Sequence, residues 1–148
     1  MKVRTSIAAI GTAIALGGTG AFLLPAAASP RAVTHTLKVI SIRKDAVNFT
    51  KTSSGQADLD VNHAGRTVGY DMLHFTFNPT TGHASGGVTL DTAGGFLYGV
   101  LRITNNPVIH GRVTGGTGAF RGAIGTITAK ALNKAGTRTA VTITYHRR

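Results

Sequence analysis

Hydrophobic and polar residues alternate along most of the chain, which is the pattern of β-strands that place one face in a core. In the segment 141–146, Val141, Ile143 and Tyr145 fall on one face, and the polar residues between them fall on the other. No segment of helix length and amphipathic spacing interrupts this alternation after residue 33. The pattern therefore predicts an all-β domain.

Eight segments share the alternation and are predicted as strands. They are 33–43, 56–61, 67–77, 84–90, 96–104, 108–113, 123–132 and 137–146. The connections are rich in Gly, Asn, Pro and Asp, which adopt the conformations that turns require. The stretches 78–82 and 133–136 are therefore predicted to be hairpin loops.

Short connections leave little chain to cover the edges of a sheet. A single eight-stranded antiparallel β-barrel removes those edges, and a β-sandwich is the alternative. Glycines inside the predicted strands favour the barrel, because strands that coil tightly bend at glycine. These glycines are Gly69, Gly86, Gly87, Gly99 and Gly111. A barrel of this size has room for side chains or for one small ligand.

The first 28 residues are predicted to be a cleavable signal peptide. Lys2 and Arg4 begin it, a glycine-containing apolar run follows, and the small residues 26–28 form the cleavage site. The glycines and Pro25 argue against the alternative, a membrane anchor. We therefore expect a secreted protein with a signal peptide at 1–28, one barrel domain at 29–148 and no transmembrane segment after cleavage.

The composition excludes some kinds of chemistry and some classes of binding partner. The chain contains no cysteine, which excludes disulfides and thiol chemistry. Its formal net charge of +11 at pH 7 favours contact with an anionic envelope polymer, and a simply solvated basic surface is the alternative. Nucleic acid recognition is disfavoured, because the chain has no Trp and no motif that combines basic residues with base-stacking aromatic rings.

The segment VTGGTGAFRGAIGTITAK, at 113–130, is rich in glycine without being a phosphate-binding loop. Such a loop runs into a helix N-terminus, whereas β-branched residues typical of a strand follow Gly125. Arg121 stands where the third glycine of the GxGxxG pattern belongs. The segment is therefore predicted to turn the chain between two strands.

The phrase GGTGAFRG at 115–122, followed by Ala-Ile-Gly and a threonine-rich strand, resembles the signature hairpin of the allene oxide cyclase and dirigent protein superfamily. The resemblance extends from about Ala57 to the C-terminus and is greatest to bacterial secreted members. It implies an eight-stranded barrel, usually trimeric, whose lumen accepts a lipophilic or phenolic molecule. It also implies isomerase, cyclase or dirigent-type chemistry without a redox centre.

Two positions depart from the dirigent pattern. Ala119 and Ile124 stand where dirigent proteins commonly carry an acidic residue and an arginine. In those proteins the acid and the guanidinium would protonate or orient a quinone methide. The departure argues against that activity in this chain, and whether the chain is an enzyme stays open at this point.

Three aspartates are candidates for the catalytic site. Asp58 and Asp60 lie two residues apart and so share one face of a strand, and Asp71 lies in the next strand. A carboxyl pair beside a buried lumen can act as general acid and base, because each charge raises the pKa of its neighbour. The alternative is that the aspartates face solvent or pair with Arg66.

Tyr70, Tyr98 and His110 complete the candidate site. Either tyrosine can offer a hydroxyl to a ligand in the lumen, or can simply cap the core. His110 lies within a predicted strand, and imidazole can transfer protons near neutral pH. The six histidines of the chain lack the close spacing of metal ligands, so neither a metal nor a cofactor is expected.

Two functions follow. The first is a secreted barrel that binds a lipophilic small molecule and isomerises or orients it. The second is a non-catalytic binding or scaffold protein of the cell envelope that uses its basic surface. An open lumen with converging polar groups favours the first, and a lumen filled by side chains favours the second.

Overall fold

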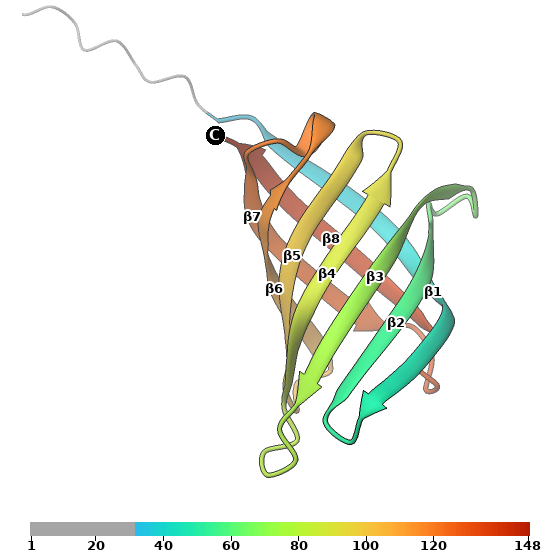
Figure 1. The fold of residues 1–148 in the computed structure, drawn as a ribbon. Helices are drawn as coiled ribbons and strands as arrows, with labels where there is room; N and C mark the ends of the chain where they lie inside the picture. The colour runs from blue at the N-terminus through green and yellow to red at the C-terminus, as the bar shows by residue number, and fades with distance from the viewer. Residues whose placement is uncertain (1–31) are drawn as a thin grey trace, which may run out of the picture. The chain divides into compact units, whose positions relative to one another are not determined.

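The computed structural model describes residues 32–148, so the predicted signal peptide at 1–28 lies outside the described residues. Eight antiparallel strands follow one another around a closed barrel, which confirms the barrel prediction over the sandwich (Figure 1). The strands are β1 (Thr34–Thr50), β2 (Ser53–Val61), β3 (Thr67–Phe77), β4 (Ala84–Thr92), β5 (Gly95–Ile103), β6 (Val108–Gly116), β7 (Ala123–Ala131) and β8 (Arg138–Arg147). Pairing of β1 with β8 closes the ring. Within residues 32–148, no helix is long and apolar enough to cross a membrane.

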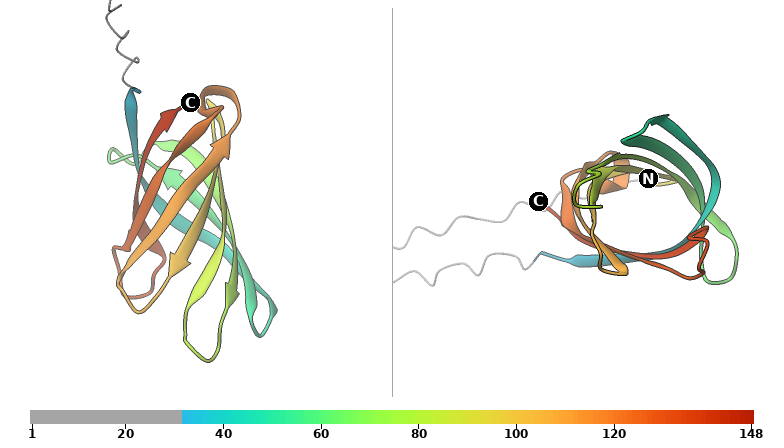
Figure 2. Two further views of the ribbon diagram at one scale, coloured as in Figure 1. Left: turned by 90° about the vertical axis from the view of Figure 1, so that its left-hand side faces the viewer. Right: turned by 90° about the horizontal axis from the view of Figure 1, so that it is seen from below.

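The hairpin between β1 and β2 is longer than predicted. β1 continues to Thr50 rather than ending at residue 43, and β2 begins at Ser53 rather than at residue 56. A β-bulge between Arg43 and Asp45 lets pairing resume beyond the barrel wall. Seen from below, this hairpin flares away from the ring (Figure 2). Its β1 side chains are exposed, so the sequence there lacks the alternation that marks a half-buried strand.

Side chains alternate between the lumen and the exterior along each strand. In β5, Leu97 and Leu101 are buried, whereas Tyr98 and Val100 between them are exposed. The lumen-facing residues of the strands and one residue from a connection form the apolar core. Its buried members are Phe75, Leu90, Leu97, Leu101, Val113, Phe120, Ala123, Ile127 and Ile143.

The glycine-rich segment closes the upper end of the barrel. It contains a short 3₁₀ helix, η1 (Gly118–Phe120), which the sequence did not predict. The Ala119 N–H donates a hydrogen bond of 2.8 Å to the Gly94 carbonyl oxygen, which ties η1 to the β4–β5 turn. Phe120 is buried there and packs edge-on against Tyr145, with ring centroids 5.6 Å apart. The glycines therefore shape a turn, as predicted, and the turn places an aromatic plug.

Gly118 is expected to be the most sensitive glycine of this segment. Its φ of +53° is left-handed, and a Cβ there would meet the Gly94 carbonyl oxygen. We expect Gly118→Ala to lower the free energy of unfolding by about 3 kcal/mol or more. The alanine would adopt a strained left-handed conformation, and the backbone at Gly94 would have to move away from its Cβ. Urea unfolding of the variant would measure the loss.

The matched control for this substitution is Gly82→Ala. Gly82 has a similar φ of +68°, but nothing lies within 4 Å of a Cβ built on it. Gly82→Ala should lower the free energy of unfolding by only about 1–2 kcal/mol, which is the cost of the left-handed conformation for alanine. Equal losses in the two variants would contradict the close packing of η1 against the β4–β5 turn.

Candidate functional site

The barrel encloses a cavity of about 240 Å³ below the aromatic plug. Most of its wall is aliphatic, with contributions from Val39, Leu73, Val88, Leu97, Leu101 and Ile127. The cavity extends to the lower end of the barrel, where Pro107, Gly136 and the exposed Arg43 lie at its rim. An apolar cavity of about 150 Å³ is already large enough to bind benzene. The lumen therefore has room for a small organic molecule.

Three carboxyl groups lie inside this mostly apolar cavity. Asp58 and Asp60 reach it from β2, and Asp71 reaches it from β3. Asp58 and Asp71 are direct partners in the β2–β3 register, so their side chains meet on the lumen face. All three residues are buried, and Asp60 has 0% of its surface exposed. The alternative of solvent-facing aspartates is therefore wrong.

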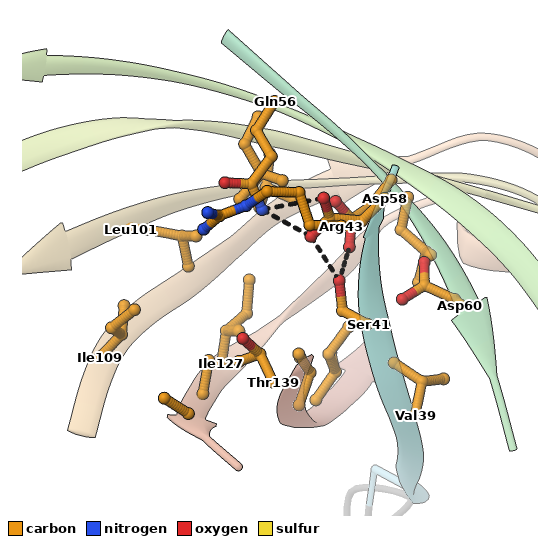
Figure 3. A pocket seen from close by; sticks show the side chains of 18 of the residues that line it. Val39, Ser41, Arg43, Gln56, Asp58, Asp60, Leu101, Ile109, Ile127 and Thr139 are labelled. Atoms are coloured by element: carbon orange, nitrogen blue, oxygen red, sulfur yellow. Dashed lines mark hydrogen bonds between the residues drawn. The ribbon is translucent and has the colours of Figure 1, made fainter. Parts of the chain in front are cut away.

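Asp58 is the carboxyl group with the most hydrogen-bond donors. The Ser41 hydroxyl on β1 donates to Asp58 Oδ2 at 2.7 Å, and the Gln56 amide donates to both Asp58 oxygens at 2.8 and 2.7 Å (Figure 3). The Ser41 hydroxyl also lies 3.1 Å from Asp71 Oδ2. A hydroxyl carries a single proton, so Asp58 and Asp71 compete for the same donor.

Asp60 and Asp71 form a pair that holds a proton. Burial, followed by the charges of Asp71 and Asp58, raises the pKa of Asp60 from 3.8 to about 8. Burial and the charge of Asp58 raise the pKa of Asp71 to about 6, although its hydrogen bonds with Ser41 and Asp60 oppose that rise. Burial and the neighbouring charges thus raise the pKa of both carboxyl groups, so that the pair retains a proton near neutral pH.

The unpaired oxygens of this pair agree with a shared proton. When both groups are ionised, Asp60 Oδ1, Asp60 Oδ2 and Asp71 Oδ1 have no donor within residues 32–148. A proton on Asp60 allows a hydrogen bond between the two carboxyl groups, which favours the protonated form of Asp60.

Arg43 is the one cationic residue among the described residues that line the cavity. It belongs to β1 immediately before the bulge, and its side chain extends from that strand near the rim (Figure 3). Its positive charge at the entrance partly offsets the negative charge of the aspartates within. The cavity thus has a charged entrance, an apolar wall and an acidic side.

The structure separates the six predicted site residues into two groups. Asp58, Asp60 and Asp71 converge in the lumen, whereas Tyr70, Tyr98 and His110 lie on the outside of the barrel. Tyr70 is 59% exposed and Tyr98 37% exposed, because each follows or precedes a lumen-facing residue on its strand. These two tyrosines therefore do not reach the lumen, and His110 does not contact the carboxyl groups.

Sequence reasoning missed the polar neighbours of the aspartates. Ser41 and Gln56 are polar residues at lumen positions of strands whose other lumen residues include Val39. A serine on an apolar face is a weak signal, because it can equally hydrogen-bond to the backbone. Gln56 stood at the predicted start of a strand, where a polar residue is unremarkable. Arg43 was not predicted to line the lumen either.

The shared proton predicts an unusual dependence of stability on pH. Asp60 holds a proton up to about pH 8 in the folded state but only up to about pH 3.8 in the unfolded state. The folded state binds more protons between these values, so the free energy of unfolding should fall as pH rises, by up to about 1.4 kcal/mol per pH unit. Urea unfolding at several values between pH 5 and pH 8 would measure this fall.

Asp60→Asn keeps the shape of the side chain but stays neutral, so its profile should be flatter than that of the wild type. Asp91→Asn is the matched control, since Asp91 is an exposed aspartate on β4. Its profile should follow the wild type. A wild-type protein whose stability rises from pH 5 to pH 8 would show that the Asp60 carboxyl is ionised in the folded state.

Solved structures with a similar fold are known, although comparison of the sequence gives no match. No family model and no curated protein matches the chain. A solved structure of pyocyanin demethylase aligns with a TM-score of 0.64 at 16% identity, over 75% of this chain and 99% of that one. Two pterocarpan synthase dirigent proteins align with TM-scores of 0.64, at 17% and 16% identity. The alignments cover 78% and 87% of this chain and 97% and 100% of theirs.

These likenesses show that the chain has the barrel fold of dirigent proteins. They confirm the fold that the GGTGAFRG phrase led us to expect. At such low sequence identity, structural similarity shows the fold alone. The chemistry has to be argued from the residues in the lumen.

Proposed function

We propose that the chain binds a lipophilic small molecule in the barrel lumen and isomerises or orients it through the Asp60–Asp71 pair. One observation carries the proposal: three buried carboxyl groups converge on an apolar cavity, and two of them compete for one proton. Perturbed carboxyl groups in an otherwise apolar cavity are typical of binding and catalytic sites.

The energetic cost of this arrangement supports a functional role. A carboxyl group that is buried without a donor destabilises the folded state, and an apolar side chain of similar size at Asp60 would avoid that cost. A barrel that served only as a scaffold would gain stability from such a replacement. The lumen also contains open space rather than a complete filling of side chains, which argues against the scaffold function.

The two carboxyl groups suit a proton shift within the ligand. The protonated Asp60 donates its proton to a ligand oxygen, and the ionised Asp71 accepts a proton from a ligand carbon. The ligand gains one proton and loses one, so the net change is an isomerisation. Transfer of the proton from Asp71 to Asp60 then restores the starting state. Ser41 and Gln56 hold the Asp58 side chain in place beside the pair through hydrogen bonds.

The departures from the dirigent pattern fit a site on β2 and β3. Ala119 lies in η1 and is exposed, and Ile124 lies on β7 outside the set of residues that line the cavity. Neither position supplies an acid or a guanidinium group to this chain. The names of the similar structures refer to pyocyanin and to pterocarpan, and the proposal extends small-molecule handling, rather than either compound, to this barrel.

Binding in the lumen can be tested with neighbouring residues on opposite faces of β5. Leu101 lines the cavity, whereas Val100 is 40% exposed on the outside. We expect Leu101→Trp to fill the cavity and weaken binding of the probe 2-naphthol at least tenfold, with little effect of Val100→Trp. Fluorescence titration of 2-naphthol would measure the affinities, and circular dichroism would verify folding.

Val88→Phe provides a smaller filling of the same cavity if the tryptophan variant does not fold. Unchanged affinity in a folded cavity-filled variant, or no binding by the wild type, would rule out the lumen as the site.

Proton transfer can be tested separately from binding. In heavy water, the wild type should speed the exchange of the ring proton ortho to the 2-naphthol hydroxyl for deuterium. Asp60→Asn should lower that rate about 100-fold, because general acid catalysis contributes about 10²–10⁴-fold. Proton NMR would follow the exchange, and Asp91→Asn should behave as the wild type does. Binding without any exchange would reduce the proposed function to that of a carrier.

A further inference from the structure

The acidic residues of the chain are unevenly divided between the inside and the outside of the barrel. The whole sequence contains only five. Asp58, Asp60 and Asp71 are buried in the lumen, which leaves Asp45 and Asp91 on the outside. The exterior is therefore more strongly basic than the composition alone suggests.

The basic side chains on one side of the barrel fall into a row that crosses the strands. The strand registers place Arg102 beside His110, His110 beside Thr128, Thr128 beside Thr142 and Thr142 beside Lys38. These residues share the outer face, and neighbouring strands are about 4.8 Å apart. The row therefore has basic residues on β5, β6 and β1, with two threonines on β7 and β8 between them.

Two further cations flank this row. Arg112 lies two residues after His110 on the outer face of β6, and Lys130 lies two residues after Thr128 on β7. We call Lys38, Arg102, His110, Arg112 and Lys130 the basic face, and all five are exposed. Figure 2, left, views the molecule from this side, with β6 and β7 toward the viewer.

The basic face also contains a shallow hollow. Arg102, His110 and Arg112 line it together with the hydroxyl-bearing residues Thr76 and Ser85. Guanidinium groups bind tetrahedral oxyanions through paired N–H donors, and hydroxyl groups add further donors. The hollow thus offers the donors that a phosphate or sulfate group accepts.

Neither exterior aspartate neutralises the basic face. Asp91 pairs with Phe96 and Tyr70 in the strand registers, and Asp45 pairs with Ala57 beyond the bulge of β1. The hollow beside Arg102 and Arg112 is lined by no Phe, Tyr or Trp on which a nucleic acid base could stack. Its chemistry is therefore suited to the charged backbone of a polymer rather than to its bases.

We propose that the basic face binds a linear polymer of phosphate or sulfate groups. The polymer lies across the outer strands, with oxyanions at Arg102 and Arg112 and further charges along the row toward Lys38. The site is on the opposite side of the barrel wall from the lumen. It therefore works independently of the proposed small-molecule site and gives His110 a role outside the proton chemistry.

The experiment compares two double variants that change the net charge equally. Arg102→Gln with Arg112→Gln removes the centre of the basic face. Arg66→Gln with Arg121→Gln is the control, with one residue in the β2–β3 turn and the other directly after η1. All four arginines are exposed, so both proteins should fold, which circular dichroism would verify. Calorimetric titration with long-chain inorganic polyphosphate and with heparin at several salt concentrations would measure affinity.

We expect the wild type to bind at least one of the two polymers and the Arg102/Arg112 variant to bind it at least tenfold more weakly. The slope of log affinity against log salt should fall by about 1–2 in that variant. The control variant should lose no more than about threefold. The tighter of the two polymers identifies phosphate or sulfate as the recognised group.

Three results would overturn the proposal. Equal weakening in both double variants would show that total charge, and not this face, attracts the polymer. No binding of either polymer by the wild type at low salt would remove the site. Tighter binding of single-stranded DNA with the same phosphate content would show that bases contribute to recognition.

Discussion

Closure of the sheet between β1 and β8 is the constraint on which the rest of the molecule depends. Once the ring is closed, every strand residue points either into a narrow lumen or out to the exterior, and one residue's direction fixes that of its neighbours. The β2–β3 register then places Asp58 against Asp71 on the lumen side. The same alternation places Tyr70 and Met72 outside. The acidic site and the exposed surface are thus two results of a single register.

The lumen aspartates remain distinct because their partners differ. Asp58 accepts hydrogen bonds from the Ser41 hydroxyl and the Gln56 amide. Asp60 has no such donor within the described chain, so burial and its charged neighbours favour its protonated form. Three chemically identical side chains thereby come to differ in their hydrogen-bond partners, and burial raises the pKa of Asp60 and Asp71. Gln56 lies on the same strand as Asp58, whereas Ser41 reaches the aspartates because β1 lies beside β2.

Much of the fold could be predicted from the sequence, because alternation reports burial on one face. The strand at 67–77 was predicted with the bounds that the structure has. The outer part of β1 was not, since its residues face solvent and carry no alternation. That Asp58 and Asp60 share a face was also predictable, but not which face, because a shift of one residue exchanges lumen and exterior. Ser41 and Gln56 could not be assigned, since their role arises only from pairing between strands.

The two ends of the barrel differ, because the aromatic plug lies at only one of them. Phe120 and Tyr145 pack at the upper end, and the residues that line the cavity include Arg43 and Pro107 at the lower end. In the proposed function, a molecule that enters from the lower end would leave by the same path, so a product would have to depart before the next molecule could reach the aspartates. Exchange of the occupant is then sequential, and a tightly held product would act as a competitive inhibitor. The turnover rate of such a barrel would then depend on the rate of product release as well as on the rate of the chemical step.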